Sequence, residues 1–175
     1  YISVEEYKRP KFEVTFKPIT ETYKINDSIT VKGSAIAFAG STISNAKIKY
    51  RVHRKIQFPR WFYWYQPNSK VLERQEIIHG EAFTDAQGNF NIIFRAIPDK
   101  SANALDLPIF TYEISAAVTD INGETRSTKT DVKVGYHSLT TQLIIEDKID
   151  KNNKGNSISI ESRNLNNEFV TAKGI

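Results

Sequence analysis

One run of residues constrains the fold of this chain more than any other, because it alternates strictly between apolar and basic side chains. Its four apolar members are Ala46, Ile48, Tyr50 and Val52, and its four basic members are Lys47, Lys49, Arg51 and His53. Successive side chains of a β-strand point to opposite faces, so a period of two separates the two kinds of residue. The run therefore predicts an antiparallel strand that has one buried face and one solvated face.

The same period of two recurs along most of the chain. Between Phe12 and Val134 it predicts about seven strands, separated by turn residues at the spacing of a β-sandwich. These strands are expected over residues 12–16, 28–38, 46–53, 71–84, 90–94, 110–118 and 125–134. No window of useful length has the apolar spacing of a helix. We therefore predict an all-β fold, an antiparallel seven-stranded fibronectin/immunoglobulin-like β-sandwich, with a barrel as the alternative.

Turn residues indicate how these strands connect. The segment Asp85–Gly88 forms a short turn, so the strands before and after it are expected to pair as a hairpin. Asn122 and Gly123 both tolerate the positive φ of a tight reverse turn, which predicts a second hairpin. Gly80 lies inside a strand and indicates a bulge or a close backbone contact there.

The alternation extends to both ends of the chain, outside the seven strands. Residues 1–7 are expected to form one strand, which Pro10 separates from the next because proline has no N–H for a sheet. After a connector the pattern restarts, with strands expected around a polar loop at 147–156 and a further strand at 164–170. This tail is too short to close a second sandwich. We therefore expect three units: the last strand of a preceding module at 1–7, a complete sandwich at 8–135, and the N-terminal part of a following, partial sandwich at 136–175.

Composition narrows the classes of function. The chain has 175 residues, 39% of them hydrophobic, and its net charge of +4 does not demand a nucleic-acid partner. No apolar run approaches the ~18 residues that a membrane-spanning helix needs. The absence of cysteine excludes disulfides, thiolate metal sites and cysteine nucleophiles within the chain. The chain starts at Tyr1 and contains no methionine, so we expect an excised piece of a longer protein.

Several stretches match motifs of one known family. Residues 4–14, VEEYKRPKFEV, resemble the junction V-E-E-Y-x-x-P-x-F-E-V that joins consecutive macroglobulin domains in the α2-macroglobulin and complement superfamily, and Lys8-Arg9 resembles its bacterial branch. Residues 31–54, which contain AKIKYRV, are similar to the family's A-x-[IV]-x-Y-x-V strand. Residues 80–94, GEAFTDAQGNFNIIF, are similar to its G-x-x-x-T-D-x-x-G-x-F signature, and residues 156–170 resemble the start of the next domain. The order of these motifs resembles a third macroglobulin domain followed by the start of the fourth.

The resemblance implies a fibronectin-like sandwich that is part of a large parent protein. This parent would be periplasmic or extracellular, with anchoring to a membrane as an open alternative. Members of the family trap proteases: cleavage of an exposed bait segment collapses a cage, and many then form a bond through a thioester in a C-x-E-Q sequence. This chain has no cysteine, so no functional residue of the family can be placed on it. The chain would serve as a structural scaffold, with neighbouring macroglobulin domains as partners and proteases as targets of the whole protein.

The most conspicuous candidate site is an aromatic cluster that contains both tryptophans of the chain. Its members are Phe58, Trp61, Phe62, Tyr63, Trp64 and Tyr65. Tyrosine and tryptophan are favoured anchors of interfaces, and aromatic loops can stack on sugars or bind peptides. Three interpretations stay open: rings that cover one end of the sandwich, a contact with a neighbouring domain, or a ligand site. The last would make the chain a cell-surface module that binds glycan or peptide, which is the alternative function.

The basic row Lys47, Lys49, Arg51, His53 and Lys55 is a second candidate. Such a row could attract phosphate or an acidic partner, but it is more typical of a solvated strand face opposed by acidic residues. The three histidines His53, His79 and His137 lie on different predicted strands or connectors and show no metal-ligand spacing. We therefore expect no enzyme, no catalytic residue, no cofactor and no metal site.

Overall fold

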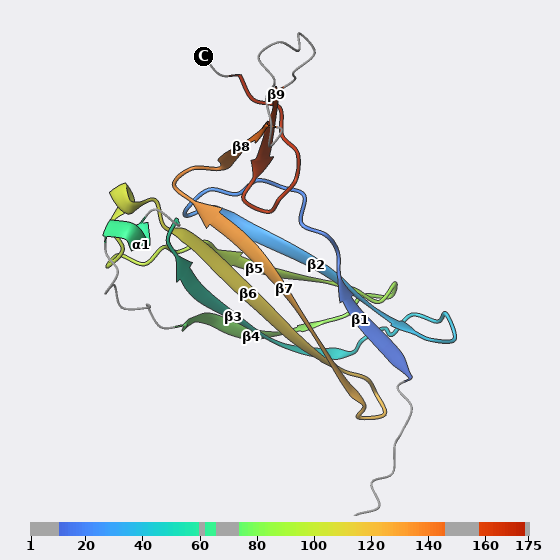
Figure 1. Cartoon of the computed structure of the whole chain (residues 1–175). Coiled ribbons are helices and arrows are strands. Elements are labelled where there is room, and N and C mark those ends of the chain that lie inside the picture. The colour runs from blue at the N-terminus through green and yellow to red at the C-terminus, as the bar shows by residue number, and fades with distance from the viewer. Residues whose placement is uncertain (1–10, 60–61, 66–73, 146–157, 174–175) are drawn as a thin grey trace, which may run out of the picture.

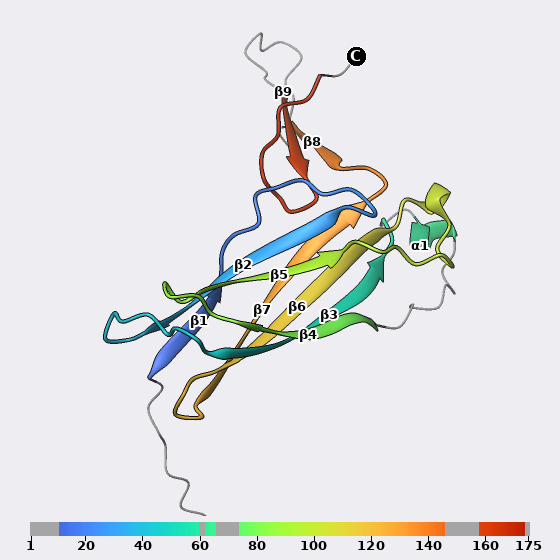
Figure 2. The ribbon, with the colours of Figure 1, turned by 180° about the vertical axis from the view of Figure 1, so that it is seen from behind.

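The computed structural model describes residues 11–59, 62–65, 74–145 and 158–173. Seven strands form two antiparallel sheets that face one another (Figures 1 and 2), which confirms the predicted seven-stranded β-sandwich over its alternative, a single closed barrel. One sheet has the order β1 (Phe12–Phe16), β2 (Ser28–Ala37), β5 (Asn89–Arg95). The other has the order β4 (Gln75–Phe83), β3 (Lys47–Gln57), β6 (Ile109–Thr119), β7 (Thr125–Gly135).

The core lies between the two sheets and is built from the alternate residues that the sequence predicted. On β6 the five inward positions are all buried: Phe110, Tyr112, Ile114, Ala116 and Val118. Gly33 on β2 leaves room for the ring of Phe90 on β5, since a Cβ at Gly33 would lie 2.3 Å from that ring. Burial of each large side chain stabilises the fold by about 1.5–3 kcal/mol, so these inward positions are the main source of its stability.

The prediction of a hairpin around Asp85–Gly88 is wrong. The turn itself forms, because Asp85 accepts backbone N–H bonds from Gln87 and Asn89 and Gly88 has a φ of +75°. However, β4 pairs with β3 and β5 pairs with β2, so the turn crosses from one sheet to the other. The end of β4 is fixed by Thr84, whose hydroxyl accepts the backbone N–H of Ala46 at 2.8 Å.

The second predicted hairpin is confirmed, since β6 and β7 pair through the turn at Asn122–Gly123. Of these two residues Gly123 has the positive φ, +82°, and the side chain of Asp120 accepts the N–H of Asn122. Gly80 on β4 makes the close approach that was expected, but to a side chain: a Cβ there would lie 2.6 Å from the hydroxyl of Tyr50. The bulge between β3 and β4 lies elsewhere, where the register shifts between Val52 and His53.

A separate two-stranded sheet follows the sandwich (Figure 1). It consists of β8 (Leu139–Ile145) and β9 (Ile158–Asn164), and we call it the β8–β9 ribbon. The further strand expected at 164–170 does not form: the chain turns at Asn164–Asn167 and makes a single bridge from Phe169 back to Arg163. The expectations for residues 1–7 and 147–156 fall outside the described residues.

Two short helical segments, α1 (Phe62–Tyr65) and η1 (Ala104–Asp106), lie at the end of the sandwich from which the β8–β9 ribbon leaves (Figure 1). We call this end of the sandwich the upper pole. Within the described ranges no helix has the length and hydropathy to cross a membrane.

Candidate functional site

The aromatic cluster lies at the upper pole, where it is split between a base and an exposed rim. Phe58, at the end of β3, stacks on Phe62 with ring centroids 4.1 Å apart. The N–H of Phe62 donates to the carbonyl of Pro59, which starts the helical turn of α1. Phe62 is buried, so these two rings form the base of the cluster and fix α1 against the sandwich.

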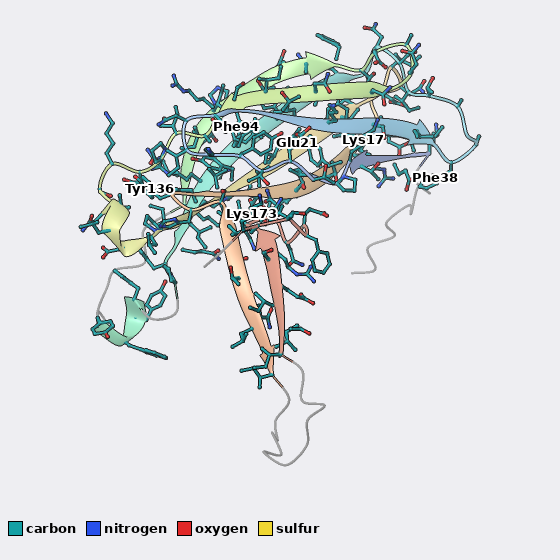
Figure 3. All side chains as sticks on the ribbon, turned by 90° about the horizontal axis from the view of Figure 1, so that it is seen from above. Lys17, Glu21, Phe38, Phe94, Tyr136 and Lys173 are labelled. Carbon is teal, nitrogen blue, oxygen red and sulfur yellow. The ribbon has the colours of Figure 1, made fainter. Side chains whose placement is uncertain are left out.

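The rest of α1 points away from the core (Figure 3). Trp64 is 77% exposed and Tyr65 80%, while Tyr63 is half-exposed and meets Phe62 edge-on. The neighbouring turn η1, which lies beside α1 in all three views, adds the exposed Leu105. Trp61 falls outside the described residues. The sequence therefore predicted an aromatic surface that the structure contains in part, whereas a contact of these rings with a partner stays a prediction.

An almost fully buried arginine supports this pole from below. Arg54 on β3 is 5% exposed and points into the sandwich, on the same face of the strand as Val52 and Ile56. Its guanidinium donates to Asp99 Oδ2 at 2.6 Å, to Gln75 Oε1 at 2.6 Å and to the carbonyl of Ile97 at 3.0 Å. It therefore ties the β5–β6 connection, which carries η1, to the strands below it. Sequence analysis missed this role, although the inward parity of a cation was visible.

Two titratable groups of this network are perturbed. The side chain and N–H of Ser101 donate to Asp99 and, with the nearby Arg54, hold the pKa of Asp99 below its ordinary value. Burial raises the pKa of Tyr112, whose hydroxyl donates to the carbonyl of Ile97 at 2.8 Å. Both shifts favour the protonation states that complete the hydrogen bonds, so they indicate a structural network.

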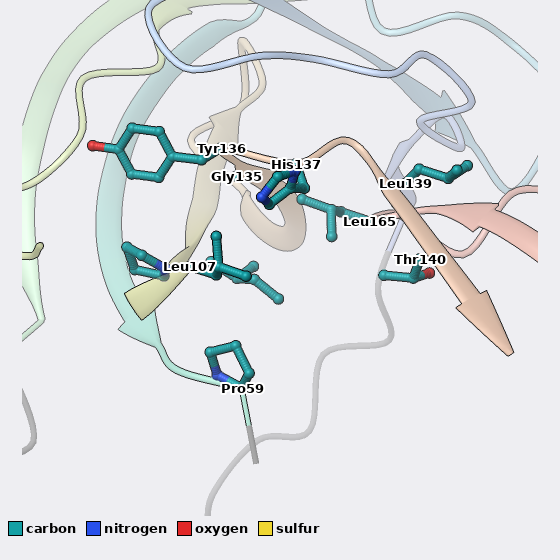
Figure 4. A pocket seen from close by; sticks show the side chains of 10 residues that line it. Pro59, Leu107, Gly135, Tyr136, His137, Leu139, Thr140 and Leu165 are labelled. Carbon is teal, nitrogen blue, oxygen red and sulfur yellow. The ribbon is translucent and has the colours of Figure 1, made fainter. Parts of the chain in front are cut away.

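An apolar pocket of about 270 Å³ opens between the sandwich and the β8–β9 ribbon (Figure 4). The sandwich contributes Pro59, Leu107, Pro108, Ile109 and Gly135, the connector to the ribbon contributes Tyr136 and His137, and the ribbon side contributes Leu139, Thr140 and Leu165. The pocket thus lies in the seam between two units. Its described lining residues offer no convergent set of charged groups and are suited to apolar packing.

Beside the pocket, three consecutive residues fasten the ribbon to the sandwich, and we call Asn164–Leu165–Asn166 the asparagine clamp. Asn164 is 2% exposed and donates through Nδ2 to Thr22 Oγ1 at 3.1 Å, while its Oδ1 accepts the N–H of Glu168 at 2.9 Å. Leu165 packs on Gly135, where an added Cβ would come within 3.0 Å of Leu165 Cδ1.

The third residue of the clamp reaches the edge of the sandwich. Asn166 Oδ1 accepts the backbone N–H of Lys133 on β7 at 2.8 Å, and its Nδ2 donates to the carbonyl of Glu21 at 3.4 Å. Sequence analysis missed the clamp because it assigned these residues to a strand. The run of asparagines, which favour turns and positive φ, was the available signal, and Asn167 indeed has a φ of +72°.

The basic row lies on the outer face of β3 and is largely opposed by acidic residues, as its solvated interpretation predicted. Lys47 pairs with Glu81 at 2.9 Å and Lys55 with Glu113 at 2.8 Å. The bulge in β4 also brings His53 and His79 to one carboxylate, Glu76. The histidines are therefore less scattered than the sequence indicated.

The protonation of His53 is disfavoured by its surroundings. Burial is the first cause that lowers its pKa, followed by the positive charge of Arg74. Within the part of the chain that the structure describes, no group of three or more His, Cys, Asp or Glu side chains is placed to hold a metal ion. The described residues thus offer surfaces and a seam, with no assembled catalytic constellation.

Comparisons with known proteins give a fold but no close relative. No protein-family model and no curated protein matches the sequence. Solved structures of bacterial α2-macroglobulins do match. The native conformation of the Escherichia coli protein superposes with a TM-score of 0.60 over 91% of this chain at 5% identity, and its elastase-activated form with 0.60 over 92% at 5% identity. A variant of the Salmonella α2-macroglobulin matches with a TM-score of 0.61 over 90% at 6% identity.

This chain therefore has a fold found within bacterial α2-macroglobulins. It spans only 11% of the native Escherichia coli structure and 10% of the Salmonella one, so it corresponds to a small part of each. The seven-stranded sandwich lies between residues 12 and 135, and a match over about nine-tenths of the chain extends beyond it.

Proposed function

We propose that this chain is a structural scaffold module of a bacterial α2-macroglobulin-like protein, a protease trap of the cell envelope. The observation that carries the proposal is the match to three bacterial α2-macroglobulin structures over 90–92% of the chain, more than a lone sandwich would supply. The role is non-enzymatic, and proteases are targets of the whole protein. The periplasmic or extracellular location follows from the same proposal.

The module boundaries are part of this proposal: residues 8–135 form a complete macroglobulin-like sandwich and residues 136–175 begin the next one. The β8–β9 ribbon supports this division. Its cross-strand pairs Leu143–Ile160 and Ile145–Ile158 share one face, and these four side chains are 43–69% exposed. A two-stranded ribbon with one apolar face needs a covering layer, which the remaining strands of a following module would provide.

In this proposal the seam at the upper pole fixes the orientation of consecutive modules. The asparagine clamp joins the ribbon both to the loop around Thr22 and to the edge of β7. Hydrogen bonds are directional, so those of the buried Asn164 and the partly exposed Asn166 together define one relative orientation. A protease cage needs walls that keep their geometry, and a joint of this kind supplies it.

A second candidate function rests on the exposure of Trp64 and Tyr65. Solvent-exposed rings beside one another can stack on a glycan or hold a peptide, which would make the chain a cell-surface binding module. Tryptophan fluorescence separates the two functions: a shift on addition of glycans or peptides to this chain would favour the second candidate, and no change would remove it.

The proposed function is tested on the longer protein of which this chain would be a module. After incubation with an endopeptidase, the protease should stay associated, cleave small peptide substrates and fail to cleave large protein substrates. A protease that remains free and fully active on large substrates would contradict the proposal. The oligomeric state of the protein should be recorded in both conditions.

A further inference from the structure

The outer face of the four-stranded sheet carries an open groove of about 480 Å³ that has no role in the proposed scaffold. Its outward-facing side chains come from the middle of all four strands: Lys49 and Arg51 on β3, His79 and Glu81 on β4, Ser115 and Ala117 on β6, and Ser127 and Lys129 on β7. The strand register places them in two rows across the sheet. One row consists of Glu81, Lys49, Ala117 and Ser127, and the other of His79, Arg51, Ser115 and Lys129.

The shape of the groove follows from the lengths of these side chains. β6 contributes only the short Ser115 and Ala117, while the long side chains of Lys49 and Arg51 stand beside them on β3. Lys129 stands on the opposite side, on β7. The result is a trough that runs along β6, with a floor of small residues and walls that end in cations.

The cations around this trough are only partly compensated. In the described part of the chain, no carboxylate lies within ion-pair distance of the ammonium groups of Lys49 and Lys129, whereas Lys47 is paired with Glu81. Arg51 reaches Glu76 only at 3.7 Å and is 69% exposed. Glu113, the carboxylate whose pKa Lys55, Arg74 and Lys129 help to lower, already accepts bonds from Lys55 and Arg74. The groove therefore has an excess of positive charge.

The spacing of these charges matches one kind of ligand. Lys49 and Arg51 are two residues apart on an extended strand, so their side chains leave β3 about 7 Å apart. Carboxylates at alternate positions of an extended peptide have the same spacing, and the low floor leaves room for such a backbone. A phosphate group would instead call for cations that converge on one point. We propose that this groove binds an extended acidic peptide segment, with carboxylates at alternate residues.

The two serines give the floor hydrogen-bonding capacity. The hydroxyl of Ser115 donates to the carbonyl of Arg51 at 3.3 Å, which leaves its oxygen lone pairs free to accept a peptide N–H. Ser127 lies in the neighbouring row, opposite Ala117. The charges bring the peptide to the sheet and the floor holds its backbone, so binding should weaken steeply with salt.

The probe for this site is a fluorescent peptide of four Glu-Ser repeats, and its control has glutamine in place of each glutamate. Binding to the chain is followed by anisotropy. The double variant Lys49→Gln/Lys129→Gln should weaken binding about tenfold, because both unpaired cations are lost. The matched control Lys17→Gln/Lys32→Gln removes the same charge at β2 and just after β1, away from the groove, and should change binding less than about twofold. All four lysines are exposed, so the fold should survive, as thermal melting would verify.

A further variant brings a competing carboxylate to the groove. Ala117→Glu should raise a carboxylate from the floor beside Lys49, where it would compete with the peptide for that cation and abolish binding. Lys17→Gln/Lys32→Gln should not abolish binding. Three results would overturn the proposal: equal binding of the glutamine peptide, equal loss in the two double variants, or displacement of the bound peptide by inorganic tripolyphosphate at concentrations far below those at which the acidic peptide itself binds. The last would assign the groove to a phosphate polyanion. None of these results bears on the scaffold function, which is tested separately.

Discussion

The sandwich and the β8–β9 ribbon use the same alternation of side chains with opposite results. In the sandwich the apolar face of each sheet meets that of the other, and residues such as Ile114 are fully buried. In the ribbon the equivalent face, which includes Ile160, remains exposed although its strands pair in perfect register. Alternation therefore makes a strand, but only a second layer makes a domain. This difference supports our proposal that the two regions belong to different modules.

The largest expected difference between the two regions involves their arginines. Arg54→Ala in the sandwich should lower the free energy of unfolding by about 3–5 kcal/mol, because it leaves Asp99 without its buried partner. Arg163→Ala in the ribbon breaks a partly exposed pair with Glu161 and a stacking contact with Phe169, and should cost less than about 1 kcal/mol. Urea unfolding measures both. Similar losses in the two variants would break the comparison.

Isoleucines offer a second matched pair. Ile114→Ala creates a cavity in the closed core and should cost about 2–5 kcal/mol. Ile160→Ala removes an exposed side chain and should stay within about 0.5 kcal/mol. Chemical denaturation measures the free energy of unfolding of each variant, and the m-values should equal that of the wild type. If Ile160→Ala cost as much as Ile114→Ala, the ribbon would already be covered in solution.

The asparagine clamp is where the two regions meet, so its loss should affect only one of them. Asn164→Ala removes the hydrogen bonds that this buried side chain makes to Thr22 and Glu168, and should lower the opening free energy of the ribbon by about 1–3 kcal/mol, with little effect on the sandwich. Hydrogen exchange of the ribbon amides reports this change. The control Asn91→Ala, at an exposed position of β5, should leave it unchanged, and equal effects of the two variants would refute the role of the clamp.

The smallest expected effect depends on pH. The pKa of Asp99 is depressed in the folded chain by Ser101 and Arg54, so folding favours its carboxylate form. Its stabilising contribution is present above the ordinary pKa of an aspartate, about 4, and is lost as the pH falls through the lower folded value. Between pH 7 and 3 the free energy of unfolding should therefore fall more steeply for the wild type than for Asp99→Asn. Parallel curves would contradict this assignment.

The sequence predicted what local pattern determines. Each strand of the sandwich followed from alternation, and the turn at Asn122–Gly123 followed from the backbone freedom of its residues. The partners of β4 and β5 did not follow. The turn at Asp85 has the same local hydrogen bonds whether its two strands pair as a hairpin or enter different sheets. Which sheet a strand joins is decided by contacts distant in sequence, such as the bond between Thr84 and Ala46.

The candidate site was predictable only in its exposed half. The aromatic composition identified the surface that carries Trp64 and Tyr65, but the residues that support it were not recognised. Arg54 was not singled out among the cations of this strand, although its place in the alternation pointed inward. The clamp residue Asn164 bonds to Thr22, more than a hundred residues away in sequence, and Asn166 bonds to Lys133, about thirty residues away. No local sequence pattern encodes such distant partners.

Residue-resolved hydrogen exchange of this chain tests the central claim most directly. If the sandwich is a complete module and the ribbon part of another, amides of β6 should exchange only through global unfolding. Amides of β9 should exchange through a local opening whose free energy is at least about 3 kcal/mol lower. If β9 amides shared the free energy, denaturant dependence and mutational sensitivity of β6, the two regions would be one cooperative unit and the account would be wrong.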